Sequence, residues 1–206
     1  DFDMKLLNRS HNSIQSIKAL DFISNLYDNF SIDLIYGIPY SSIEKWKNNL
    51  KNALKYKPPH LSCYSLTLES NTVLQHKVKN GEIELLDEEF IKEQYNYLVE
   101  ELEKKGYRNY EFSSFAIPGY YAINNSNYWN GKPYLGIGPS AHSYNGKSIR
   151  SWNISNNLNY AKSIMNNILP IKKEKLNKND LFNEYIMTGL RKEEGVSINQ
   201  IRTLFG

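Results

Sequence analysis

The feature that most constrains the fold is a threefold alternation of helical and strand-like patterns between residues 12 and 112. Apolar residues recur three or four positions apart in residues 13–26, 43–54 and 87–105, which predicts three amphipathic helices. Apolar runs bounded by turn residues predict strands at 30–36, 61–68 and 107–112, with a long polar loop between 68 and 86. Strands that alternate with helices form parallel sheets. The sequence therefore predicts an α/β fold, either an α/β barrel or an open doubly wound sheet.

The alternation stops after Pro118. A stretch rich in Gly, Asn and aromatic residues follows, and two further helical patterns span about 156–168 and 178–190. We therefore expect two parts, residues 1–118 and 119–206. The first residue is Asp1, and a helical pattern that begins at Val196 stops at Gly206, so we interpret the chain as a fragment with open sheet edges that is unstable alone.

Composition excludes several kinds of site. The single cysteine rules out an internal disulfide and any iron–sulfur cluster held by cysteines of this chain alone. The net charge is +3 and lysines are interleaved with acidic residues, which argues against nucleic acid as a partner. No two of the four histidines have metal-ligand spacing. No apolar run approaches the roughly 18 residues of a membrane helix, and no signal peptide is evident, so we expect a cytoplasmic protein that is not an integral membrane protein.

Asp33 is the residue whose position says most about function. It interrupts an apolar strand, where an unpaired buried carboxylate costs several kcal/mol. Because side chains alternate along a strand, Asp33 and Ile35 share one face while Leu34 and Tyr36 share the other. If the second face packs on helices, Asp33 lies in the barrel lumen, where it could bind a ribose hydroxyl pair. A structural Asp paired with an Arg or a backbone amide is an equal alternative.

Three other charged residues lie near strand ends. Arg9 precedes the first helix cap, at the end of an expected strand, where a guanidinium could bind a carboxylate at two points; a surface salt bridge is the commoner role. Glu69 and Glu111 lie at or near the ends of the next two strands, where barrels place their active sites. Solvation is the ordinary role for Glu69, whereas Glu111 stands between two aromatic residues.

Residues 134–142 superficially resemble a dinucleotide-binding loop. Pro139 stands where such a loop needs free backbone, and no clear helix follows. We expect instead a tight turn that brings backbone amides close to a ligand or to a neighbouring strand. His142 is a candidate for a ligand contact, although a hydrogen-bonded structural histidine is the commoner role.

Six segments in a fixed order resemble HemN/HemW-type radical S-adenosylmethionine (SAM) proteins, which include oxygen-independent coproporphyrinogen III oxidases and HemW-type heme chaperones. These segments are residues 8–11, 33–39, 59–66, 110–116, 134–141 and 184–191. The resemblance covers essentially the whole chain. It implies that residues 1–118 are the C-terminal part of a partial (β/α) radical-SAM barrel. Residues 119–206 would be a truncated, mixed and partly helical C-terminal region.

The resemblance also implies cofactors. SAM would bind across the strand ends, and a [4Fe–4S] cluster would be held by a Cys-x3-Cys-x2-Cys loop that the family places upstream of this chain. Arg9 and Asp33 match positions that contact the methionine carboxylate and the ribose hydroxyls of SAM. Positions that surround the adenosine are matched by Ile35, Leu66 and Thr67.

Residues 124–129 resemble the His-Asn-x-x-Tyr-Trp motif that is associated with heme binding in the HemW branch. The heme contacts expected from this resemblance are Asn124, Asn125, Tyr128, Trp129 and His142. Asn124 stands at the usual histidine position and cannot be a strong axial iron ligand. His142 or Cys63 could replace it.

The leading hypothesis is a heme chaperone that hands heme to a respiratory protein and that could associate with a membrane. The alternative is an enzyme, an oxygen-independent coproporphyrinogen III oxidase that decarboxylates propionates by radical SAM chemistry. A third possibility is a folded remnant without its cluster domain.

Overall fold

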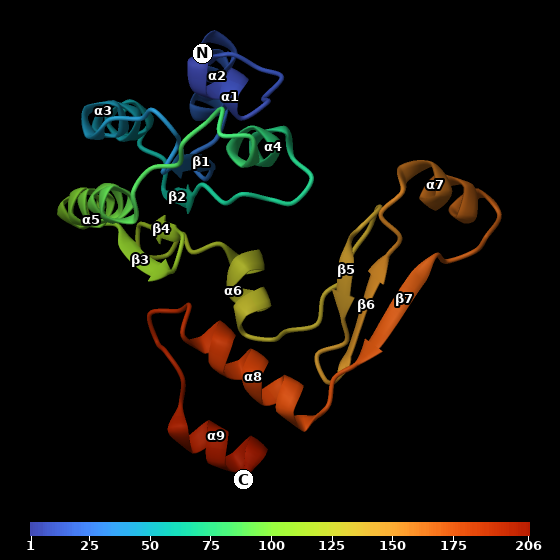
Figure 1. Cartoon of the computed structure of the whole chain (residues 1–206). Coiled ribbons are helices and arrows are strands. Elements are labelled where there is room, and N and C mark those ends of the chain that lie inside the picture. The colour runs from blue at the N-terminus through green and yellow to red at the C-terminus, as the bar shows by residue number, and fades with distance from the viewer. The chain divides into compact units, whose positions relative to one another are not determined.

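The structure, a computed structural model, describes residues 1–206 and divides into two compact units, Asp1–Tyr121 and Ala122–Gly206 (Figure 1). Each unit has its own sheet: four strands in the first and three in the second. No helix of the chain combines the length and the apolar character needed to cross a membrane. The assignment of the two units to a barrel part and a C-terminal family region stays a prediction.

The sheet of the first unit is mixed. Its strands, in spatial order, are β1 (Ser31–Tyr36), β2 (His60–Ser65), β4 (Ser114–Ala116) and β3 (Arg108–Glu111). β1 and β2 are parallel, as predicted, with Asp33 opposite Ser62. β4 is antiparallel to both β2 and β3. The expected third parallel neighbour is therefore wrong: the chain reverses at 112–113, and the short strand β4 inserts between β2 and β3.

The helices of the first unit are α1 (Phe2–Leu6), α2 (Ser13–Leu26), α3 (Ile43–Leu54), α4 (Val73–Lys79) and α5 (Glu88–Lys104). The three predicted helices are confirmed, and each begins after a side-chain cap. Asn12 accepts a hydrogen bond from Gln15 N at 2.9 Å, Ser42 from Lys45 N at 3.1 Å, and Asp87 from Glu89 N at 2.9 Å.

Two expectations about the same unit are wrong. The segment before Arg9 is the helix α1 and not a strand. The polar stretch between 68 and 86 contains α4, which begins where the Thr72 hydroxyl accepts a hydrogen bond from Gln75 N at 3.2 Å. Both helices are shorter than two full turns of apolar pattern, so neither has a periodicity that can be read from sequence.

The core of the first unit lies between the sheet and helices α3 and α5 (Figure 1). Its most deeply buried large side chains are Trp46, Leu50, Leu61, Leu98 and Phe115. The Trp46 indole donates to the carbonyl of Gln94 at 3.0 Å, which joins α3 to α5. Burial of these side chains is the main source of stability for this unit.

Substituting Leu98, which is 0 % exposed, should therefore be costly. Leu98→Ala should lower the free energy of unfolding by about 2–5 kcal/mol, because it removes packed methyl groups and leaves a cavity. Urea unfolding followed by circular dichroism measures this loss. Leu26→Ala, at a position 57 % exposed in α2, is the control and should change stability by less than about 0.5 kcal/mol. Equal losses for both variants would contradict the assignment of the core.

The second unit contains an antiparallel sheet and four helices. The strands are β5 (His142–Tyr144), β6 (Ile149–Asn153) and β7 (Ile171–Lys175), in that spatial order. The helices are α6 (Ile123–Trp129), α7 (Asn157–Met165), α8 (Lys178–Gly189) and α9 (Ile198–Phe205). The two predicted helices are confirmed as α7 and α8. The three strands were not predicted, because they are short and mostly half-exposed or exposed, with no clean alternation.

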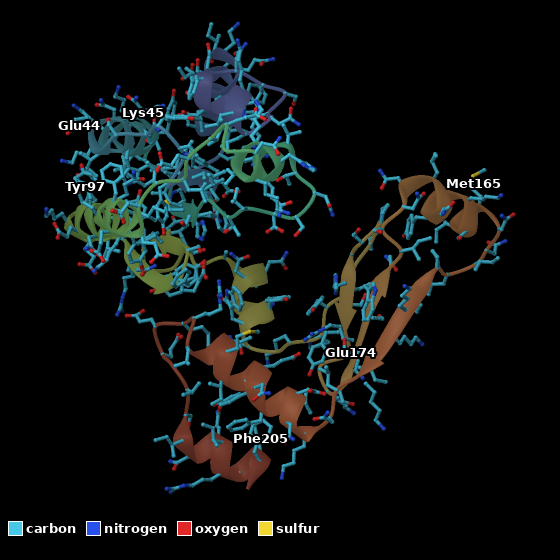
Figure 2. The ribbon with its side chains drawn as sticks, in the orientation of Figure 1. Glu44, Lys45, Tyr97, Met165, Glu174 and Phe205 are labelled. Atoms are coloured by element: carbon cyan, nitrogen blue, oxygen red, sulfur yellow. The ribbon has the colours of Figure 1, made fainter.

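Helices α8 and α9 pack against each other through aromatic side chains. Phe205 of α9 contacts Phe182 of α8 edge to face at 5.3 Å between ring centroids, and Figure 2 shows Phe205 among the side chains of this pair. Tyr185 donates to Gln200 Oε1 at 2.8 Å. Residues of both helices line a cavity in this unit.

Candidate functional site

Two regions, one in each unit, gather the residues that the sequence singled out. The first is the face of the β1–β2 sheet that points away from the helices. Ile32 and Tyr36 are buried in the helix-covered core, whereas Asp33 is exposed on the opposite face. No hydrogen bond or ion pair engages the Asp33 carboxylate. A strand residue with a free carboxylate is therefore available for a ligand.

Leu66 and Thr67 lie beside this face, directly after β2. Leu66 N donates to the carbonyl of Tyr36 at 2.9 Å, which brings the residue after β2 against the end of β1. Ile35 lies opposite Tyr64 in the register of the two strands. Arg9 lies in the exposed loop between α1 and α2, and no ion pair joins it to Asp33. Of the five residues assigned to SAM, two thus lie on β1, two directly follow β2, and Arg9 lies on a loop.

His60, Tyr110 and Glu111 form a buried polar group in this unit. The His60 imidazole is hydrogen-bonded to Ser31 Oγ at 2.7 Å and to the Tyr110 hydroxyl at 2.8 Å. Burial lowers the pKa of His60, although the nearby carboxylates of Asp33 and Glu111 raise it, so the ring is neutral at neutral pH. Sequence reasoning did not join His60 to Tyr110. The available signal was a histidine at the start of an apolar strand, after two prolines.

Cys63 lies on the helix-covered side of β2. It is 2 % exposed and belongs to the core cluster. Burial raises the pKa of its thiol, so the group stays protonated among apolar side chains. This packing removes Cys63 as a replacement for an axial iron ligand.

The second region is a cavity of about 1110 Å³ within the second unit. Its aromatic wall is a row of rings. Tyr128 lies 5.3 Å from Tyr134, and Tyr134 lies 6.2 Å from Tyr144, measured between ring centroids. Trp129 meets Tyr128 edge to face at 5.2 Å. Burial raises the pKa of Tyr134 and of Tyr144, although Arg150 lowers both, so these phenols are neutral at neutral pH.

The cavity carries an excess of positive charge. Its cationic residues are Lys132, Lys147, Arg150, Arg191 and Lys192, and its acidic residues are Glu184 and Glu194. Arg150 is paired with Glu184 at 2.6 Å, and Arg191 lies over the Trp129 ring at 5.1 Å from its centroid. The Trp129 Nε1 atom is buried and has no hydrogen-bond partner.

Of the five predicted heme contacts, Tyr128 and Trp129 line this cavity. Asn124 and Asn125, on the same helix α6, do not, and Asn124 is exposed. His142 is exposed in β5 and stacks on Trp152 at 5.9 Å between ring centroids. Sequence reasoning missed Tyr144 and Arg150 as lining residues. Each of these residues lines the cavity only because β5 pairs with β6. No local sequence pattern predicts that pairing.

The glycine-rich turn at 134–142 has a structural role. A Cβ on Gly136 would overlap the backbone carbonyl of His142, so the turn packs directly against β5. Gly136 N donates to Ser143 Oγ at 2.9 Å, and the Asn153 side chain donates to the carbonyl of Gly138 at 2.7 Å. Of the two expected alternatives, the close approach to a neighbouring strand is confirmed.

A side chain at Gly136 should therefore strain the second unit. Gly136→Ala should lower the free energy of unfolding by about 1–3 kcal/mol, since the backbone of β5 must move to admit the methyl group. Chemical denaturation of the variant measures the loss. The neighbouring Leu135 is 80 % exposed, and Leu135→Ala should leave stability within about 0.5 kcal/mol of the parent. A neutral Gly136→Ala would show that the turn is not tightly packed.

Comparison with known structures identifies the fold class of this chain. No family model matches the chain. The fold matches the structure of Escherichia coli coproporphyrinogen III oxidase, described as a radical SAM enzyme. The TM-score is 0.72 at 20 % identity, over 92 % of this chain and 46 % of that one. The predicted α/β fold class, part of a radical SAM fold, is thereby confirmed.

Curated relatives then identify the family. The heme chaperone HemW of Lactococcus lactis is 32 % identical over 203 residues, which are 98 % of this chain and 53 % of that protein. The heme chaperone HemW of Buchnera aphidicola subsp. Schizaphis graminum is 36 % identical, over 84 % of this chain and 46 % of that protein. The chain spans about half the length of these relatives. The chain belongs to the HemW-type branch of the HemN-like radical SAM family.

Proposed function

We propose that this chain is part of a heme chaperone of the HemW type, which binds heme for transfer to a respiratory protein. In the full-length protein it would also carry SAM and a [4Fe–4S] cluster. The observation that carries this proposal is the cavity of the second unit, which Tyr128 and Trp129 line. The curated relatives, whose names describe them as heme chaperones, support the same function.

The cavity fits a large, flat and anionic ligand. Its volume of about 1110 Å³ is slightly above the usual range for small-molecule sites, which is about 300–1,000 Å³. The row of Tyr128, Tyr134 and Tyr144 offers apolar ring faces to a macrocycle. The surplus of Lys and Arg side chains suits carboxylates. Heme has all three properties, because it is planar, mostly apolar and carries two propionates.

The residues of the first unit fit SAM as a second ligand. The free Asp33 carboxylate would accept hydrogen bonds from the ribose hydroxyls, and the exposed Arg9 guanidinium would bind the methionine carboxylate. Ile35, Leu66 and Thr67 would surround the adenosine. When bound, SAM and a reduced cluster would supply radical chemistry, while these residues would hold and orient SAM. The cluster cysteines would lie upstream of this chain, where the family resemblance places them.

The alternative function is oxygen-independent oxidation of coproporphyrinogen III, the activity in the name of the structurally similar E. coli protein. The same cavity suits that substrate, which is also a propionate-bearing tetrapyrrole. Tyr128 and Trp129 stand at the positions of the heme-associated motif, which favours the chaperone. A cytoplasmic location belongs to the same proposal.

The proposal predicts binding without turnover. The full-length protein, with its cluster reconstituted anaerobically, should bind heme in a saturable and stoichiometric manner. It should form no decarboxylated porphyrin from coproporphyrinogen III in the presence of SAM and a reductant. Absorbance titration measures binding, and liquid chromatography detects product. Catalytic decarboxylation would replace the chaperone function by the oxidase.

Heme binding should also depend on the aromatic wall. The double substitution Tyr128→Ala and Trp129→Ala should weaken heme binding at least about tenfold, since each ring contact contributes about 0.5–1.5 kcal/mol beyond its buried area. The matched control is Tyr27→Ala with Tyr120→Ala, because both rings are exposed and neither residue lines the cavity. An equal loss in both double variants would argue against the cavity as the heme site.

SAM binding should depend on Asp33 independently of heme. Asp33→Asn keeps the shape of the side chain but removes the charge that strengthens hydrogen bonds to the ribose, so SAM affinity should fall about tenfold or more. Heme affinity should stay unchanged. Isothermal titration with SAM, in the full-length protein with its cluster, measures the first effect. Unchanged SAM affinity would remove Asp33 from the site.

A further inference from the structure

Two lysines of the cavity come from adjoining chain segments. Tyr134 and Tyr144 form a two-way backbone bridge, and each N–H donates to the other's carbonyl at 3.0 Å. Beyond this bridge, Pro133 approaches Gly146 so closely that a Cβ on Gly146 would lie 3.1 Å from the proline Cδ. Lys132 directly precedes Pro133, and Lys147 directly follows Gly146. Both lysines line the cavity. Their backbones therefore flank the same side of it.

Both backbones are held in place. Lys132 N donates to the carbonyl of Asn127 at 3.0 Å, just beyond the end of α6. Lys147 N donates to Asn145 Oδ1 at 2.9 Å, and the Lys147 carbonyl accepts from the Tyr144 hydroxyl at 2.8 Å. The two ammonium groups thus extend from fixed points, which lowers the entropic cost of using them together.

The other cations of the cavity are already engaged. Arg150 is paired with Glu184, and Lys192 Nζ donates to Asn130 Oδ1 at 2.8 Å. Arg191 lies over the Trp129 ring. By contrast, no hydrogen bond or ion pair engages the ammonium group of Lys132 or of Lys147. Lys132 and Lys147 are therefore the cations of the cavity whose ammonium groups are not already held by a contact within the protein.

We propose that Lys132 and Lys147 together form a carboxylate-binding subsite that recognises the two propionates of heme. This inference rests on the proposed function and specifies that the cavity recognises heme through its propionates. An ammonium group donates up to three hydrogen bonds, and bonds to carboxylates are charge-assisted. The macrocycle would lie against the tyrosine row, of which Tyr134 and Tyr144 belong to the same two segments as the lysines. The subsite selects the free diacid over a neutral porphyrin.

The test compares hemin with hemin dimethyl ester, which has the same ring and iron but no carboxylates. The full-length protein should bind hemin about tenfold more tightly than the ester, because both lysines are exposed and each exposed ion pair is worth a few-fold in affinity. In the double variant Lys132→Gln and Lys147→Gln, hemin should bind about tenfold more weakly and the preference for hemin over the ester should disappear.

Two further double variants control for charge and for folding. Lys172→Gln with Lys173→Gln removes two positive charges from β7, where neither residue lines the cavity, and should retain the preference for hemin. Lys132→Arg with Lys147→Arg keeps both charges and should also retain it. Circular dichroism checks that every variant is folded.

The outcomes separate the two proposals. If the glutamine double variant keeps the full preference for hemin, the subsite is wrong while heme binding stands. If loss of the β7 lysines abolishes the preference equally, overall charge and not the subsite discriminates, which also overturns the inference. If the parent protein binds neither hemin nor its ester, the proposed function fails, and the subsite fails with it.

Discussion

The buried side chain of Gln94 holds the first unit together where β1 ends. Its Oε1 accepts a hydrogen bond from Gly37 N at 2.9 Å, and its backbone carbonyl accepts one from the Trp46 indole at 3.0 Å. One residue of α5 thereby fixes both α3 and the segment that follows Asp33. Its Nε2 lies buried without a partner, and an unsatisfied donor of this kind costs about 1–3 kcal/mol. The surrounding core must outweigh that cost.

Gly37 shows why this junction needs its particular residues. Its φ of +74° lies in the left-handed region, which glycine adopts without strain. The chain can therefore turn sharply after Tyr36 while its amide reaches Gln94. The pleat of β1 places Asp33 on the exposed face, whereas Tyr36 packs in the core against Trp46 and Tyr95. The candidate ligand face thus depends on contacts made on the opposite side of the sheet.

Sequence predicted those parts of the fold whose signals are local. The helices α2, α3 and α5 each combine a cap with a regular apolar stripe, and the period of two along β1 placed Asp33 opposite the core. The strand β4 has three residues and the helix α1 has five, too few to establish a period. The inverted direction of β4 depends on a turn whose residues carry no strong turn signal. The shortness of β4 and α1, more than their composition, prevented their prediction from sequence.

The cavity of the second unit was beyond prediction for a different reason. Tyr128 and Trp129 could be singled out by motif, but their neighbours come from residues 130 to 205 and meet through pairings between distant segments. Arg150, for example, reaches Glu184 across 34 positions of sequence. No pattern within one element encodes such a contact. The pairing of Arg150 with Glu184 can be recognised only in the folded structure, where β6 and α8 lie close together.

The three tryptophans of the chain occupy three different surroundings. Trp46 is sealed in the core of the first unit, Trp129 lines the cavity, and Trp152 stacks with His142 on β6. The intrinsic fluorescence of the protein is therefore a sum of three distinguishable reporters. Trp46 emission follows the integrity of the first unit, whereas quenching of Trp129 follows whatever enters the cavity. Single-tryptophan versions of the chain would separate folding from ligand entry without any added dye.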